Sequence, residues 1–94
     1  MKPLDSQLRP ALAARVRLQK DPVTGEPVLL FPEGLLILNP TAHEIVSRCD
    51  GVATVERIVA ALSEEYDAPA DQLAADVAAC LHDLRQRNLI VLSP

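Results

Sequence analysis

The sequence predicts a single α+β domain in which a small antiparallel sheet is followed by three helices. A chain of 94 residues has room for one domain and one hydrophobic core. Apolar residues alternate or form short blocks in the first forty residues, and they recur with helical spacing afterwards. Hydrophobic residues make up 49% of the chain but aromatic residues only 2%, so the core must be aliphatic.

The first strands are predicted by alternation and by clusters of turn-forming residues. Residues 1–12 mix prolines and charges without a clear period, which indicates a loosely held, mobile arm or a short helical turn. Residues 15–20 alternate polar and apolar side chains, as a half-buried strand does. Residues 21–26 are dense in turn formers, and residues 27–31 form the returning strand. We expect a β-hairpin here.

The third strand is a block of four large apolar residues, namely Leu35, Leu36, Ile37 and Leu38. Turn signals flank the block, with Pro32-Glu33-Gly34 before it and Asn39-Pro40 after it. If this strand lies at the edge of the sheet, its unpaired N–H and C=O groups are able to pair with a further strand. We expect this edge to be the functional surface.

Three helices follow, each marked by an apolar stripe and a terminal signal. The first is capped by Asn39, begins at Pro40 and ends near Cys49, before Asp50-Gly51. The second is capped by Thr54 and extends to Tyr66. The third ends near Asn88, and its stripe comprises Leu73, Val77, Cys80, Leu81 and Leu84. Residues 89–92 are short and apolar, which fits either a fourth strand or an extended tail.

Charge and composition argue against several classes of function. The net charge is −4, and five of the nine basic residues lie within residues 1–20, so the body of the chain is acidic. An acidic body repels the phosphate backbone, and two aromatic residues give no stacking platform for bases, so we expect no nucleic-acid partner. No apolar run is long enough for a signal peptide or a membrane span. We expect a cytoplasmic protein with no membrane partner, in which Cys49 and Cys80 are small buried hydrophobes, with a disulfide between them as the less favoured alternative.

The sequence offers no set of residues for catalysis or for a cofactor. His43 and Cys49 are six residues apart and His82 and Cys80 are two apart, and neither spacing brings both side chains to one helix face. We therefore expect no metal site, no cofactor and no independent enzyme. Asp76 lies at the margin of the third apolar stripe, where it faces either a groove or open solvent.

A basic pair stands out in the first strand. Arg15 and Arg17 share one face of this strand in the predicted alternation, so they form either a cationic patch or two ordinary solvated residues.

The order of these signals resembles the pyrroloquinoline quinone (PQQ) biosynthesis protein D family, over nearly the whole chain from about Arg9 to Leu92. The matching residues are Arg15-x-Arg17, Asp21-Pro22-x-x-Gly25, Leu30-Phe31-Pro32-Glu33-Gly34, Leu38-Asn39-Pro40-Thr41-Ala42, Ile45, Cys49-Asp50-Gly51, Thr54-Val55, Ile58, Leu62 and Tyr66. Asn88 replaces the glycine expected after the last helix, and asparagine also tolerates the left-handed conformation. The resemblance implies a three-stranded sheet followed by a three-helix bundle of winged helix-turn-helix character.

The resemblance also implies a function. Proteins of this family are peptide chaperones that bind a ribosomally made precursor peptide and present it to a radical S-adenosylmethionine (SAM) enzyme, which carries out the chemistry. We expect the precursor to add as a strand at residues 35–38. By resemblance, the groove wall comprises Asp76, Val77, Cys80, Leu81 and Leu84, with Asp76 fixing the register.

Further partners and other functions remain open at this stage. Arg15, Arg17 and the arm are the candidates for contact with the radical SAM enzyme, and an open edge also allows a homodimer at high concentration. The alternative function is a winged-helix DNA-binding transcriptional regulator, which needs a basic recognition helix. A third interpretation is a non-catalytic structural subunit.

Overall fold

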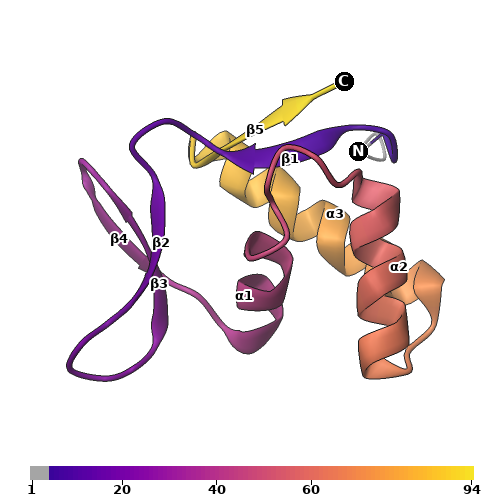
Figure 1. The fold of residues 1–94 in the computed structure, drawn as a ribbon, viewed down its shortest axis with the longest axis horizontal. Coiled ribbons are helices and arrows are strands. Elements are labelled where there is room, and N and C mark those ends of the chain that lie inside the picture. Colours follow the sequence, from indigo (N-terminus) through magenta and orange to yellow (C-terminus); the bar gives the residue numbers. More distant parts are fainter. Residues whose placement is uncertain (1–4) are drawn as a thin grey trace.

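A computed structural model describes residues 5–94 and has an α+β fold with three helices and antiparallel sheets (Figure 1). The elements in chain order are β1 (Arg9–Leu12), β2 (Arg17–Lys20), β3 (Pro27–Phe31), β4 (Gly34–Ile37), α1 (Pro40–Val46), α2 (Val55–Tyr66), α3 (Ala70–Gln86) and β5 (Ile90–Ser93). Residues 5–94 contain two sheets, a three-stranded sheet ordered β2-β3-β4 and a two-stranded sheet of β1 and β5. The second sheet was not predicted from the sequence.

The predicted meander is the sheet β2-β3-β4, in which all neighbours are antiparallel. The returning strand β3 has the predicted bounds. β2 begins at Arg17 rather than at residue 15, because Arg15 has a left-handed backbone conformation with φ of 71° and ends the extended run. β4 ends at Ile37, but the N–H of Leu38 still donates to the carbonyl of Pro27 at 2.9 Å.

The arm predicted for residues 1–12 is wrong for Arg9–Leu12, which form β1 and pair with β5. Pro10 is almost fully buried, and it pairs in register with Leu92. The pairing partner lies about eighty residues away, so no local periodicity indicates it. Residues 1–4 of the predicted arm lie outside the described residues. The apolar C-terminal residues, which fit either a fourth strand or an extended tail in the sequence, form the strand β5.

α1 and α2 begin at the predicted caps. The Asn39 side chain accepts the Ala42 N–H at 2.7 Å, and the Thr54 side chain accepts the Arg57 N–H at 3.2 Å. α1 ends at Val46, three residues before the predicted end near Cys49. Asn88 follows α3 with φ of 62°, which is the left-handed conformation expected for it.

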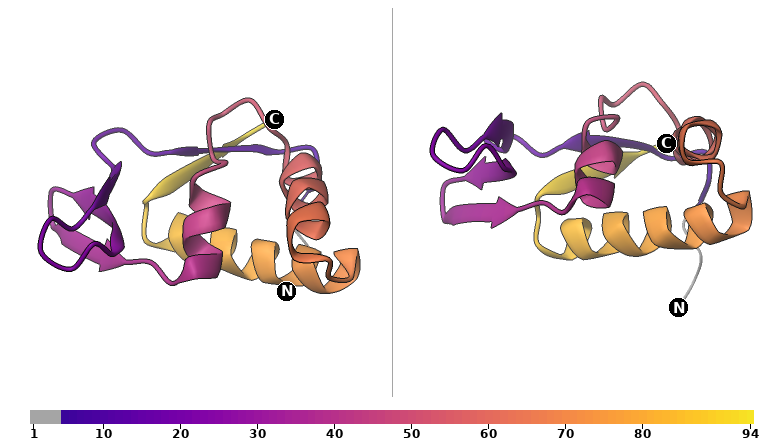
Figure 2. Two further views of the ribbon diagram at one scale, coloured as in Figure 1. Left: turned by 60° about the horizontal axis from the view of Figure 1, so that its bottom comes forward. Right: turned by 90° about the horizontal axis from the view of Figure 1, so that it is seen from below.

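The core lies where α3 packs against α1, α2 and β5. It is aliphatic, as the composition predicts, with members from every helix and from both sheets: Leu29, Leu38, Ile45, Val46, Cys49, Val55, Ile58, Leu62, Leu73, Val77, Leu81, Leu84, Leu89 and Ile90. Figure 2 shows the three-stranded sheet at one end of the molecule, next to α1 and the C-terminal end of α3. None of the helices described is both long and apolar enough to cross a membrane.

Candidate functional site

The outer edge of β4 is vacant within the described part of the chain. β4 is the last strand of its sheet and pairs only with β3. In an antiparallel pair, residues alternate between those that bond across the pair and those whose N–H and C=O groups point outward. Leu38 bonds inward to Pro27, so Leu36 also bonds inward, whereas Leu35 and Ile37 direct their backbone groups away from the sheet. Their side chains are 53% and 57% exposed, respectively.

A groove lies between this strand and the helices. Its volume is about 400 Å³, and we call it the β4–α3 groove. The residues that line it come from β4 and the following turn, from α1 and from α3: Leu36, Ile37, Leu38, Asn39, Thr41, Ala42, Ile45, Asp76, Ala79, Cys80, Asp83 and Leu84. The sheet edge predicted from the sequence therefore lies beside a cavity whose walls can contact the side chains of an extended peptide.

The contribution of α1 to the groove was not predicted. Asn39 caps α1 at the end of the turn that follows β4, and Thr41, Ala42 and Ile45 of this helix line the groove. Ile45 is 1% exposed and also belongs to the core. Only Leu38 and Asn39 separate β4 from α1, and this short connection is the sequence signal that the start of the helix lies close to the end of the strand.

α3 forms the opposite wall, and here part of the prediction is wrong. Asp76, Cys80 and Leu84 line the groove, but Val77 and Leu81 are 1% and 0% exposed and belong to the core. The apolar stripe of α3 therefore faces the core. The adjacent face, one residue earlier in the helical period, faces the groove and adds two residues that the prediction missed, Ala79 and Asp83.

The two thiols lie in apolar surroundings. Burial and, to a smaller extent, the nearby Asp83 carboxylate raise the pKa of Cys80 to about 11. Burial likewise raises the pKa of Cys49 to about 12, with smaller contributions from Cys80 and Asp50. Both thiols are protonated at neutral pH, so Cys80 gives the groove an apolar surface rather than a nucleophile. Among residues 5–94, no three His, Cys, Asp or Glu side chains converge as metal ligands.

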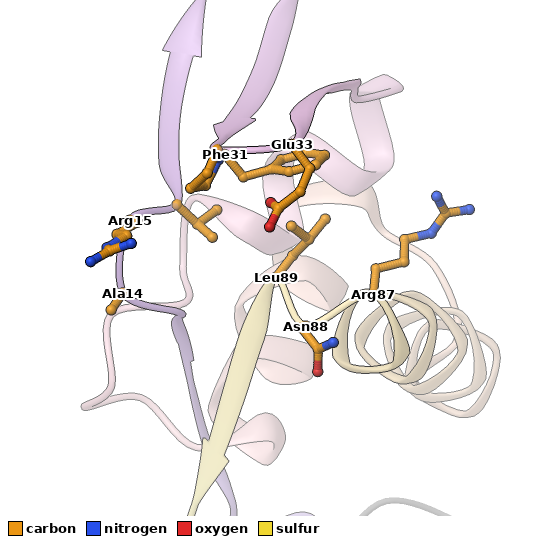
Figure 3. A pocket seen from close by; sticks show the side chains of 9 residues that line it. Ala14, Arg15, Phe31, Glu33, Arg87, Asn88 and Leu89 are labelled. Carbon is orange, nitrogen blue, oxygen red and sulfur yellow. The ribbon is translucent and has the colours of Figure 1, made fainter.

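The structure separates the two arginines that the sequence placed on one strand face. Arg17 is exposed on β2, whereas Arg15 precedes the strand in its left-handed conformation. Arg15 lines a different cavity together with Arg87 and Asn88 (Figure 3). Neither arginine lines the β4–α3 groove. The extended strand, from which the shared face was predicted, does not include Arg15.

The fold matches a solved recognition domain. The solution NMR structure of the PqqD truncation of Methylobacterium extorquens PqqCD superimposes with a TM-score of 0.77 and 34% sequence identity. The match covers 92% of this chain and 90% of that one, which is described as a functional, stand-alone recognition element for ribosomally synthesized and post-translationally modified peptides (RiPPs). The molecule is therefore an α+β domain of the RiPP recognition element class.

The sequence comparisons identify the family. Residues 26–90 match the family profile described as Coenzyme PQQ synthesis protein D (PqqD). A PqqA binding protein of Rhizobium meliloti is 39% identical over 79 residues, which is 84% of this chain and 81% of that protein. A PqqA binding protein of Xanthomonas axonopodis pv. citri is 40% identical over 84 residues, which is 89% of this chain and 91% of that protein. This chain belongs to the PqqD family.

Proposed function

We propose that this chain binds the precursor peptide PqqA in PQQ biosynthesis as an added strand at the outer edge of β4. The observation that carries the proposal is the vacant edge at Leu35 and Ile37 beside the β4–α3 groove. Relatives at 39% and 40% identity are named PqqA binding proteins, which supports this choice of peptide. The role is non-catalytic.

In this proposal, backbone contacts and side-chain contacts make different contributions to peptide binding. The outward N–H and C=O groups of Leu35 and Ile37 pair with the peptide backbone, which supplies affinity for any extended chain. Selectivity comes from the groove, where alternate peptide side chains reach Cys80 and Leu84. Asp76 is exposed at the groove wall and fixes the register through a hydrogen bond or an ion pair.

A second step follows from the same family assignment. The bound peptide is presented to the radical SAM enzyme of the pathway, and Arg15 and Arg17 contact that enzyme. The two arginines are exposed and lie outside the β4–α3 groove, so they are free for a second partner while the peptide is bound.

Isothermal titration calorimetry with synthetic PqqA tests the first step. We expect saturable one-to-one binding, and clearly weaker binding of a peptide of the same composition in scrambled order, which keeps the backbone contacts but loses the side-chain contacts. The second step is tested with the double charge reversal Arg15→Glu and Arg17→Glu, which lowers formation of the ternary complex with the enzyme and leaves binary peptide affinity intact. The opposite pattern would mean that the two surfaces are exchanged.

The alternative function, DNA binding by a winged helix, finds little support in the charges of the helices. α3 carries three exposed aspartates, Asp71, Asp76 and Asp83, and its exposed arginines, Arg85 and Arg87, lie only at its C-terminal end. A recognition helix needs basic residues along its exposed face to contact phosphates and bases. The winged-helix likeness itself stays a prediction.

A further inference from the structure

A cluster of charged side chains joins the C-terminal end of α1 to α2. Arg48 lies in the turn that follows α1, and its guanidinium group donates to three acceptors. One nitrogen, Nη1, donates to the backbone carbonyl of Glu44 at 2.9 Å and to the carboxylate of Glu44 at 2.8 Å. The other, Nη2, donates to the carboxylate of Glu65 on α2. We call Glu44, Arg48 and Glu65 the ion-pair bridge.

The bridge connects parts of the chain that are distant in sequence. Glu65 lies 17 residues after Arg48. Among residues 5–94, this contact is the one ion pair between distant residues, because the other two pairs have i,i+4 spacing. The Arg48 side chain is only 27% exposed and is shared by two carboxylates. Such a network fixes geometry better than an isolated surface ion pair does.

α1 depends on contacts of this kind for its position. The helix has seven residues, and isolated helices shorter than about 12 residues are marginal in water. The Asn39 cap holds its first turn beside β4, and Arg48 binds the carbonyl of Glu44 in its last turn, where a cation also complements the helix dipole. Figure 2 shows α1 between the three-stranded sheet and α2. The cap therefore holds α1 on the sheet side, and the bridge holds it on the α2 side.

The position of α1 matters for the groove. Thr41, Ala42 and Ile45 of this helix line the β4–α3 groove opposite α3. Neither Arg48 nor Glu65 lines the groove, and α2 contributes no residue to its lining. A change in the bridge can therefore reach a bound peptide only through the placement of α1.

We propose that Arg48 and Glu65 are positioning residues for peptide binding, which hold α1 where it completes the wall of the β4–α3 groove. The inference rests on the proposed function, since it concerns the same groove, and it gives α2 a role in that function. A wall that is already in place lowers the cost of ordering the site when the peptide binds. Loss of the bridge leaves every peptide-contacting side chain present but makes that ordering part of the binding step.

Calorimetry with PqqA on bridge variants tests the inference. We expect Glu65→Gln to weaken peptide binding about threefold and Arg48→Met about fivefold, at a temperature where every variant is fully folded. Glu64→Gln is the matched control, because Glu64 is an exposed acid next to Glu65 on α2 that has no ion pair within the described part of the chain. Affinities equal to the parent in both bridge variants would overturn the inference and leave the peptide groove standing.

A double-mutant cycle tests whether Glu65 acts through Arg48. In an Arg48→Met background, Glu65→Gln should cause no further loss of peptide affinity, because the carboxylate has already lost its partner. Arg48→Lys keeps the charge but has a single donor nitrogen for the two carboxylates, so it should recover part of the affinity lost in Arg48→Met. Fully additive losses in the double variant would show that Glu65 acts by another route, and would overturn its assignment.

Tyr66 provides a readout that needs no peptide. It is the single tyrosine of the chain and lies beside the bridge. Desolvation and the carboxylates of Glu44 and Glu65 raise the pKa of the Tyr66 phenol, whereas Arg48 lowers it. In an absorbance titration, the phenol pKa should therefore be higher in Arg48→Met than in the parent, and lower in Glu65→Gln. An unchanged phenol pKa in both variants would show that the bridge does not form in solution.

Amide exchange in the free protein completes the test. In Glu65→Gln, exchange at the α1 amides of Ile45 and Val46 should accelerate relative to the parent, while the amides in the middle of α3 keep their rates. Unchanged exchange along α1 would contradict the positioning role. Failure of the parent itself to bind PqqA would refute the proposed function, whereas full affinity in the bridge variants would refute only this inference.

Discussion

The two edges of the three-stranded sheet differ in chemistry. On β2, the exposed side chains are Arg17, Gln19 and Lys20, and no residue of this strand lines the β4–α3 groove. On β4, there is no charged residue between Gly34 and Leu38, and the exposed side chains are Leu35 and Ile37. Charged side chains on an edge strand discourage pairing with other strands, and lysine is especially effective.

The difference between the two edges supports β4 as the edge that binds an added strand. The N–H of Asp21 donates to the carbonyl of Glu26 at 2.8 Å, so alternation along β2 directs the backbone groups of Leu18 and Lys20 outward. Both edges therefore carry free backbone groups. Only β4 combines them with apolar side chains and a neighbouring groove. The proposed selectivity of the sheet thus rests on side chains, not on the backbone.

The largest effect is expected from proline at the vacant edge. Leu35→Pro removes an outward N–H that no strand of the sheet uses, so peptide affinity should fall about tenfold or more while the fold is retained. Calorimetry with PqqA measures the affinity and circular dichroism checks the fold. Leu36→Pro is a poorer test, because the N–H of Leu36 points toward β3 and its loss would destabilise the sheet.

Two control variants distinguish the loss of the Leu35 backbone N–H from other causes of weaker peptide binding. Lys20→Pro removes an outward N–H on β2 and should leave peptide affinity unchanged. Leu35→Ala removes the side chain but keeps the N–H, so it should weaken binding less than proline does. A larger loss in Lys20→Pro than in Leu35→Pro would reverse the assignment of the edges.

A smaller effect is expected from the polar contact in the groove. Asp76→Ala should weaken peptide binding about fivefold, on the order of 1 kcal/mol, because one charge-assisted contact is lost. The difference between variant and parent should shrink at high salt if the contact is an ion pair. Glu64→Ala is the control, since Glu64 is an exposed acid on α2 outside the groove. Identical affinities for Asp76→Ala and the parent would remove Asp76 from the site.

Making β2 resemble β4 should produce weak self-association. In the variant Arg17→Thr with Lys20→Ile, the edge loses both positive charges and should pair with a second copy at high protein concentration. Sedimentation velocity over a concentration series would show a dimer that the parent forms less readily. Adding the change Ile37→Lys to the parent should suppress any dimer that uses β4. Unchanged association in both variants would show that edge charge does not control pairing here.

The smallest effect concerns Cys80 at the groove wall. Alkylation by iodoacetamide proceeds through the thiolate, so in a Cys49→Ala background it should be slow at neutral pH and accelerate as the pH rises toward about 11. Bound PqqA should slow the reaction further. The raised pKa also means that folding favours the neutral thiol: this contribution to stability is complete below the ordinary value of 9.0 and is lost as the pH rises through about 11. Rapid modification at neutral pH would contradict an apolar groove.

Local signals predicted most of the fold. The caps Asn39 and Thr54, the strand Pro27–Phe31 and the helix Val55–Tyr66 depend on neighbouring residues, so they are readable from sequence. β1 is not, because Arg9–Leu12 has no clear period and its partner strand lies at the other end of the chain. The two-stranded sheet therefore appears only in the structure.

The candidate site was predicted in part, for a similar reason. The apolar stripe identified α3 correctly, but pattern alone does not tell the core-facing side from the groove-facing side next to it. Val77 and Leu81, which the family resemblance implies for the groove wall, lie in the core, and Ala79 and Asp83 were missed. Arg15 was misplaced because no residue type signals a left-handed arginine.

Hydrogen–deuterium exchange by NMR, with and without PqqA, tests the central claim most directly. In the free protein, the outward N–H groups of Leu35 and Ile37 should exchange fast, as should those of Leu18 and Lys20 on β2. Addition of PqqA should slow exchange at Leu35 and Ile37 only. Protection of the β2 amides instead, or binding that leaves the β4 amides unprotected, would contradict strand addition at this edge.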